Sequence, residues 1–314
     1  TAYSPESEDD EPLLFTVENG AISIESDGDV MVFTPIDPSE MNTEAPDFEA
    51  LFSGITAAEY TEPDEYSIEN AVIVDDENIT FTIESVEDTG TEIRIKVFCE
   101  NKTNTTLYFG TDYVAVNGYL NDPYWGTTVA AGKKAKETFV FYKIQLDGLL
   151  PINELSFTLR VTDDDNWEAE PFLLDRFTVN PTGVVNPAIP DRRTSPTEQT
   201  IVDDENITFI VLGQEENWFG KGYQVYIENN TNTTLAFSWD NVSVNGFMND
   251  PYWGTTVPSH TRAYSVVTFY NLEEIGISDL SEIKETEFKL RVSDEDNWNA
   301  DPIIEQVFTF STQG

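Results

Sequence analysis

The chain contains one cysteine, one histidine and few cationic side chains. Because Cys99 is alone, no intrachain disulfide can form, and the fold must be stabilised by burial. There are 16 Lys and Arg residues against 59 Asp and Glu residues, which gives a formal net charge of -43. Such a charge repels phosphate backbones and anionic lipid surfaces, so we do not expect nucleic acid to be a partner.

Long apolar runs and familiar catalytic motifs are also missing. No segment approaches the roughly 20 apolar residues of a membrane-spanning helix, and we expect no part of this sequence to act as a signal peptide. We expect either a cytosolic protein or, as we favour, the mature part of an exported one, with a lipid anchor upstream as one form of attachment. There is no P-loop, dinucleotide fingerprint or Cys/His metal pattern, and no carboxylate pair is singled out for glycoside hydrolysis. An enzyme is the least favoured class.

The sequence contains two copies of one module. The nine residues NDPYWGTTV occur at 121–129 and again at 249–257, and IVDDENITF occurs at 73–81 and 201–209. The copies align with an offset of 203 − 75 = 128 residues, which becomes 298 − 167 = 131 beyond Phe141. The second copy therefore carries a three-residue insertion, which we expect in a loop.

The alignment limits the roles of the two rare side chains. Cys99 aligns with Ile227, which favours a buried apolar thiol over a nucleophile. His260 aligns with Gly132, so a histidine-based triad cannot occur in both copies.

Within each copy, hydrophobic side chains recur at every second position, which predicts strands with one buried face. The clearest series are Ile95, Val97 and Cys99 with Tyr223, Val225 and Ile227, and Phe157, Leu159 and Val161 with Phe288, Leu290 and Val292. Similar runs near 79–86, 106–116, 137–144 and 172–179 bring the count to six or seven strands in about 105 residues. We therefore predict an all-β fold, with two tandem immunoglobulin-like antiparallel β-sandwiches.

The first 72 residues differ from the repeats. They hold nineteen acidic side chains and no Lys, Arg or His, so this end is expected to be a solvated anionic surface. Asn19-Gly20 and Asp27-Gly28 separate three β-rich runs, which predicts a small β-meander. Phe48, Leu51, Phe52 and Ile55 follow a helical spacing, which predicts one short helix beside it.

The predicted organisation has four parts. They are an N-terminal meander-and-helix region at 1–72, a first sandwich at 73–180, a Pro-rich linker at 181–200 and a second sandwich at 201–314. The linker suggests beads on a string, although a packed interface between the copies stays open. We expect a monomer.

The repeated NDPYWGTTV segment is the first candidate site. Asn-Asp-Pro favours a turn, so the aromatic pair is expected at or beside a loop. In one interpretation a ring caps the open end of the sandwich and excludes water from the core. In the other, the aromatic pair forms a platform for a sugar ring, with the aspartate accepting hydrogen bonds. The candidate ligand-binding residues are Asp122, Tyr124, Trp125, Asp250, Tyr252 and Trp253.

The second candidate site is acidic and follows a strand in each copy. TDDDNW at 162–167 and SDEDNW at 293–298 offer hard oxygen ligands of the kind that calcium prefers, although a solvated turn is the default interpretation. The candidate calcium ligands are Asp163, Asp165, Asn166, Asp294, Asp296 and Asn297. No cofactor other than calcium is expected. The VDDEN segments at 74–78 and 202–206 are expected to begin a first strand with a polar edge.

The repeats resemble modules of secreted or lipid-anchored bacterial proteins, of the kinds described as lipoproteins and cell-surface adhesion proteins. The resemblance lies in VDDENITF, ENKTNTTL, VAVNGYLNDPYWGTTVAAGKKA and FTLRVTDDDNW, and it covers about 73–179 and 201–310. It implies immunoglobulin-like sandwiches and an extracellular or envelope-attached location, and it supplies no active site.

Together these patterns predict a non-enzymatic, extracellular bacterial surface protein that acts as a binding, adhesion or spacer module. Its partner would be another surface protein or a glycan. The alternative is a carbohydrate-binding protein that uses the Tyr-Trp loops of each repeat.

Overall fold

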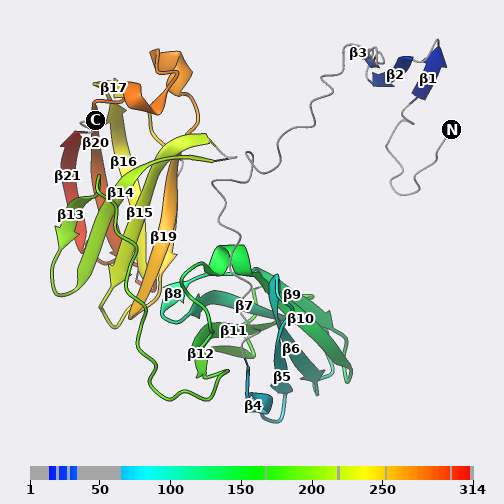
Figure 1. Ribbon diagram of the computed structural model, residues 1–314. Coiled ribbons are helices and arrows are strands. Elements are labelled where there is room, and N and C mark those ends of the chain that lie inside the picture. Colours follow the sequence, from blue (N-terminus) through cyan, green and yellow to red (C-terminus); the bar gives the residue numbers. More distant parts are fainter. Residues whose placement is uncertain are drawn as a thin grey trace. The chain divides into compact units, whose positions relative to one another are not determined.

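The structure is a computed structural model, which describes residues 14–18, 21–26, 29–33, 65–166, 168–217, 220–251, 253–297 and 299–311 (Figure 1). The chain forms two compact units, Thr1–Thr61 and Glu62–Gly314. In the first unit, β1 (Leu14–Glu18), β2 (Ala21–Ser26) and β3 (Asp29–Phe33) pair antiparallel in the order β1-β2-β3. This confirms the meander, while the helix predicted around Phe48–Ile55 lies outside the described residues.

The first copy consists of two antiparallel sheets. One has the strand order β10-β6-β5-β4, and in the other β7 pairs with β11, β8 and β9, and β11 pairs with β12. The strands are β4 (Glu69–Asp75), β5 (Ile79–Asp88), β6 (Glu92–Asn101), β7 (Leu107–Val116), β8 (Tyr119–Leu120), β9 (Trp125–Val129), β10 (Lys134–Tyr142), β11 (Leu155–Asp163) and β12 (Leu173–Val179). A 3₁₀ turn, η1 (Lys143–Leu146), follows β10.

The second copy repeats this arrangement. One sheet has the order β19-β15-β14-β13, and in the other β16 pairs with β20, β17 and β18, and β20 pairs with β21. The strands are β13 (Gln199–Asp203), β14 (Ile207–Asn217), β15 (Gly220–Asn229), β16 (Leu235–Val244), β17 (Phe247–Met248), β18 (Gly254–Val257), β19 (Thr261–Phe269), β20 (Glu285–Asp294) and β21 (Ile304–Ser311). Two 3₁₀ turns, η2 (Leu272–Ile275) and η3 (Leu280–Glu282), precede β20 where the first copy has η1, so the insertion lies in a connecting loop.

The strand order defines an immunoglobulin-like sandwich. β6 pairs with β10 in one sheet, whereas the intervening strands β7 and β9 belong to the other, where β7 also pairs with β11. This crossing between sheets is the Greek-key connection of immunoglobulin folds. β4 adds an edge strand beside β5.

Each sandwich encloses its own hydrophobic core, built from the alternating positions predicted from the sequence. All twelve side chains of the four series are buried, and Leu159 and Leu290 are both 0% exposed. In the first copy, the rings of Phe81 on β5 and Phe157 on β11 meet across the two sheets with centroids 6.2 Å apart. Cys99 is a buried free thiol, as predicted. Its burial raises the pKa of the thiol to about 12.

Two local predictions differ from the structure. The first copy begins before Ile73, because β4 starts at Glu69 and the N–H groups of Ser67 and Ile68 donate to the Pro181 carbonyl. The VDDEN segment does not begin a strand. Asp76 accepts the N–H groups of Asn78 and Ile79 and so forms the tight turn between β4 and β5, and Asp204 does the same in the second copy.

The two copies and the linker contact one another through a cluster of aromatic residues. The backbone N–H of Arg262 on β19 donates to the Gly118 carbonyl at 2.9 Å, next to the parallel pairing of β8 with β19. The Tyr119 ring is buried and stacks on Tyr264, with centroids 5.6 Å apart. The hydroxyl of Tyr119 donates to the linker carbonyl of Pro190. This packed joint replaces the beads-on-a-string arrangement suggested by the linker.

Candidate functional site

The aspartates of the repeated NDPYWGTTV segments hold the backbone of a bulge. In the first copy, the carboxylate of Asp122 accepts the N–H groups of Tyr113 at 3.0 Å and Tyr124 at 3.1 Å. Asp250 accepts the N–H of Val242 at the matching bulge of β16. Burial raises the pKa of Asp122. The carboxylate of Asp122 therefore fixes the turn that was expected at Asn-Asp-Pro.

The aromatic pair of the first copy is divided between the core and the solvent. Trp125 is 8% exposed and packs against Phe81 and Phe139, with ring centroids 6.1 and 5.7 Å apart. Tyr124 has a positive φ of 45° and is 89% exposed. Trp125 is thus placed as a ring that caps the core. Because Trp125 is buried and Tyr124 is exposed, the two side chains do not form a common surface on which a sugar ring could stack.

The second copy keeps its tryptophan closer to the solvent, while Tyr252 lies outside the described residues. Trp253 is half-buried, and its Nε1 donates to the Ser265 hydroxyl at 3.0 Å. Its ring contacts the buried Trp239 edge-on, with centroids 5.9 Å apart. Trp253 therefore has one face against the core and lines an open pocket with its remaining surface.

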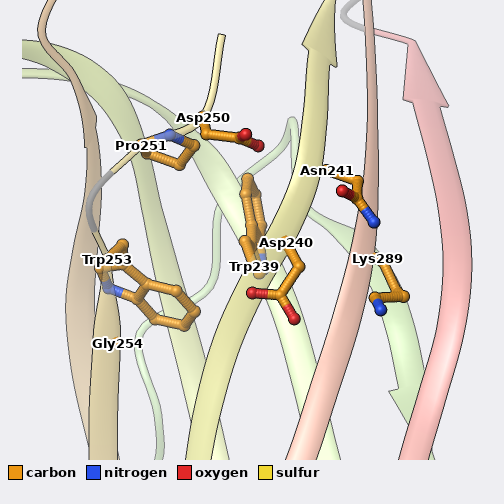
Figure 2. Close-up of a pocket in the computed structure, with 8 residues that line it drawn as sticks. All are labelled: Trp239, Asp240, Asn241, Asp250, Pro251, Trp253, Gly254 and Lys289. Atoms are coloured by element: carbon orange, nitrogen blue, oxygen red, sulfur yellow. The ribbon is translucent and has the colours of Figure 1, made fainter. Parts of the chain in front are cut away.

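This pocket has a volume of about 780 Å³ and combines an aromatic wall with polar groups (Figure 2). The lining residues are Trp239, Asp240, Asn241, Asp250, Pro251, Trp253, Gly254 and Lys289. Figure 2 shows the Trp253 ring on one side, with the Asp240 carboxylate and the Lys289 ammonium group across from it. Of the predicted site residues, the structure places Asp250 and Trp253 here.

Strand pairing positions the charged groups of the pocket. Asp240 on β16 lies directly opposite Lys289 on β20. The ammonium group of Lys289 also pairs with Glu305 on β21 at 3.0 Å, and this contact lowers the pKa of Glu305. Asn241 sits at the bulge with a positive φ of 52°, a conformation that asparagine tolerates well. The pocket therefore offers a carboxylate, an amide and an ammonium group beside an indole ring.

Sequence reasoning missed Trp239, Asp240, Asn241 and Lys289. A signal was present, because the copies differ at several of these positions while many of their neighbours are alike. Thr111 and Tyr113 occupy the positions of Trp239 and Asn241 in the first copy, and Thr158 occupies that of Lys289.

The acidic segments predicted to bind calcium form local turns. The carboxylates of Asp163 and Asp294 accept the N–H groups of Asp165 and Asp296, each at 3.0 Å. Asn166 donates its backbone N–H to the Asp163 carbonyl, and Asn297 donates its N–H to that of Asp294. Among the residues that the structure describes, no group of three or more His, Cys, Asp or Glu side chains is placed to hold a metal ion. Calcium binding here stays a prediction.

Comparison with known proteins adds little to this geometry. No protein-family model matches the chain, and no curated protein matches its sequence. Among solved structures, a Salmonella enterica SafA pilin in complex with the SafB chaperone is similar over 77% of this chain and 99% of that chain, with 10% sequence identity and a TM-score of 0.24. A likeness this distant carries no argument, so the immunoglobulin-like assignment rests on strand order. No described helix is long and apolar enough to cross a membrane.

Proposed function

We propose that this protein is a non-enzymatic bacterial surface protein in which the second sandwich binds a partner and the first supports it. The open pocket beside Trp253 carries the proposal, because it places an aromatic wall next to groups that donate and accept hydrogen bonds. The packed joint between the copies supports a spacer role, since it connects the second sandwich to the first by more than a flexible tether.

The extracellular or envelope-attached location comes from the resemblance of the repeats and is tested by labelling. Lys134 and Lys136 are suitable targets, because their side chains are 61% and 71% exposed. Intact cells of the source organism would be treated with a membrane-impermeant amine reagent, and the protein would then be isolated. Labelling of intact cells is the expected result. Labelling only after lysis, with a periplasmic marker as control, would contradict the proposed location.

A carbohydrate is the second candidate ligand, favoured by the half-exposed Trp253 ring beside Asp240 and Asn241. Sugar rings stack on indole faces while their hydroxyls bond to carboxylates and amides. Titration with polysaccharides, followed by tryptophan fluorescence, tests this candidate. Trp253→Phe should weaken a response, whereas the matched Trp125→Phe should not, because Trp125 is buried. A response that is equal in both variants, or absent with every glycan, would remove the carbohydrate candidate.

A further inference from the structure

A tyrosine ring covers the outer face of the first sandwich next to β9. Tyr108 points outward from β7, and its ring lies over Gly110 on the same strand and over Gly126 on β9. These two glycines are paired with each other across the strands. A methyl group on Gly110 would lie 2.8 Å from ring atom Cε1, and one on Gly126 would overlap the Tyr108 hydroxyl. The glycines thus form a flat floor on which this phenol ring rests.

The second copy keeps one glycine of the floor, and no ring of a described residue is found in the position of Tyr108. Ala236 occupies the position of Tyr108, Ser238 that of Gly110, and Gly254 that of Gly126. Ser238 and Gly254 are again paired across the strands. Apart from the chain neighbours of Gly254, the only described atom within 4 Å of a methyl group built on it is the Phe237 carbonyl oxygen, at 3.4 Å. With alanine in the place of tyrosine, the side chains of the described residues leave a hollow over this surface.

The uncovered surface is a groove of about 590 Å³. Ala236, Ser238, Gly254 and Thr256 belong to its floor, and Arg291 and Glu295 line it as well. Asp240 and Gly254 are shared with the pocket beside Trp253, so the two hollows adjoin. We refer to this hollow as the β16 groove.

The charged groups around Tyr108 have counterparts in the β16 groove. Burial raises the pKa of Tyr108, the nearby Tyr124, Asp112 and Asp164 raise it further, and Arg160 lowers it. Arg160 also pairs with Asp112 at 2.8 Å. At the same positions, the second copy has Arg291, Asp240 and Glu295. The second copy therefore repeats the charged residues that surround Tyr108, although it has alanine in the place of that tyrosine.

Two of these groups have unmet interactions among the described residues. The Oε2 atom of Glu295 is buried and accepts no hydrogen bond from the described residues. Arg291 is exposed and forms no ion pair with a described carboxylate, although it lies near enough to Glu305 to help lower the pKa of that carboxyl. A buried carboxylate oxygen without a donor is costly, and a guanidinium group stacks well on an aromatic face. Both groups would gain an interaction from a phenol in the groove.

We infer that the β16 groove is a binding site for a tyrosine side chain presented by a partner protein. The ring lies over Gly254 as Tyr108 lies over Gly126, its hydroxyl donates to Glu295, and Arg291 packs on its exposed face. Tyr108 occupies the equivalent site in the first copy, which therefore has no room for a second ring.

Ser238 shifts the bound ring relative to Tyr108. Its Cβ would lie too close to a ring in the Tyr108 position, as the 2.8 Å distance at Gly110 shows. A ring that belongs to a partner is not tethered to residue 236, so it can move toward Gly254 and Thr256. A variant that copies the first sandwich must therefore combine Ala236→Tyr with Ser238→Gly.

The site extends the binding role proposed above, and its test does not depend on where the protein resides. The ¹⁵N-labelled full chain would be titrated with N-acetyl-tyrosinamide while backbone amide shifts are recorded by NMR. We expect saturable shifts at Gly254, Ser238 and Thr256, with smaller shifts for N-acetyl-phenylalaninamide because it lacks the hydroxyl. The shifts do not depend on where the protein is located in the cell. The proposed surface location could therefore be wrong while the tyrosine site is right, and the reverse.

Two blocked variants complete the test. Ala236→Tyr with Ser238→Gly fills the groove as in the first copy, and Gly254→Leu covers the floor independently, should the first variant fold poorly. Both should abolish the shifts. Shifts that persist in a folded blocked variant, their absence in the wild type, or equal or larger shifts with glucose at the same amides would overturn the proposal.

Discussion

The Tyr108 ring lies directly over Gly126 in the first copy. The equivalent residue of the second copy is Gly254, and a methyl group placed on it would have no side chain of a described residue within 4 Å, its two chain neighbours aside. Two copies with nearly the same loop sequence thus present different surfaces, and the copies differ here at two positions of β7 and β16, Tyr108/Ala236 and Gly110/Ser238. Alanine at position 236 has no ring to lie over Gly254, while the strand pairing beneath is kept between Ser238 and Gly254. In the first copy this surface is covered by Tyr108, whereas in the second copy the described residues leave the hollow in which we propose that a partner's tyrosine binds.

The joint between the copies depends on the stack of Tyr119 on Tyr264. The planes of the two rings are 5° apart, and the Arg193 guanidinium group lies 4.3 Å from the Tyr264 centroid. Tyr264→Ala should weaken the joint by about 1–2 kcal/mol, in line with the strength of aromatic and cation–π contacts. NMR relaxation should then report separate tumbling of the two sandwiches. Tyr270→Ala is the control, because Tyr270 is 62% exposed; identical tumbling in Tyr264→Ala and the wild type would show that the stack does not hold the joint.

Asn101 stabilises the first copy from within. Its side chain is 0% exposed, and its Nδ2 donates to the carbonyls of Thr105 and Val129, each at 2.8 Å. Its Oδ1 accepts from the Thr103 N–H and hydroxyl. Asn101→Ala removes these four hydrogen bonds and should lower the free energy of unfolding by about 1–3 kcal/mol, measured by urea denaturation.

The control for Asn101 is Asn104, an exposed asparagine three residues further along the chain. Asn104→Ala should change the free energy of unfolding little. Equal losses in the two variants would show that the hydrogen bonds of Asn101 are not the source of its effect. Asn229 makes the same bonds in the second copy, to Thr233 and Val257, and should behave like Asn101.

The linker contributes a stabilisation that depends on pH. Arg192 donates two hydrogen bonds to Glu198 at 2.8 and 2.9 Å, which lowers the pKa of Glu198 from 4.5 to about 2. Because the folded-state pKa is below the unfolded one, this stabilisation is present above pH 4.5 and is lost as the pH falls toward 2. Glu198→Gln should therefore reduce the loss of stability in that window, measured by urea midpoints against Glu273→Gln. The same acid dependence in Glu198→Gln as in the wild type would contradict this role.

The thiol of Cys99 should be unreactive in the folded protein. It is 0% exposed, and burial raises its pKa to about 12, so the reactive thiolate is scarce at neutral pH. A maleimide reagent should label the protein only in denaturant, as followed by mass spectrometry. Rapid labelling of the native protein would indicate that β6 opens to solvent.

Much of the fold could be predicted from the sequence because burial leaves a periodic signal. The alternation around Val97, Val225, Leu159 and Leu290 identified four central strands, and the repeat offset carried each assignment from one copy to the other. Short strands carry no such period. β8 has two residues and β9 has five, and neither segment was among the runs predicted to be strands.

The candidate site could be predicted only in part. The repeated Asp-Pro-Tyr-Trp segment indicated the correct loops. Residues that are identical in the two copies, however, serve the structure that both copies share, which is a fixed bulge and a filled core. The pocket and the β16 groove arise where the copies differ, at Ala236 and Asn241 among other positions. Whether Trp125 or Trp253 faces solvent depends on contacts between distant strands, which no local pattern encodes.

The most direct test of the account exchanges the outer faces of the two copies. The variant combines Tyr108→Ala and Gly110→Ser with Ala236→Tyr and Ser238→Gly, and N-acetyl-tyrosinamide is titrated into the ¹⁵N-labelled protein. If one tyrosine position decides which sandwich is open, the shifts should leave the Gly254 amide and appear at Gly126. Shifts that remain at Gly254 in the folded exchange variant would contradict the account.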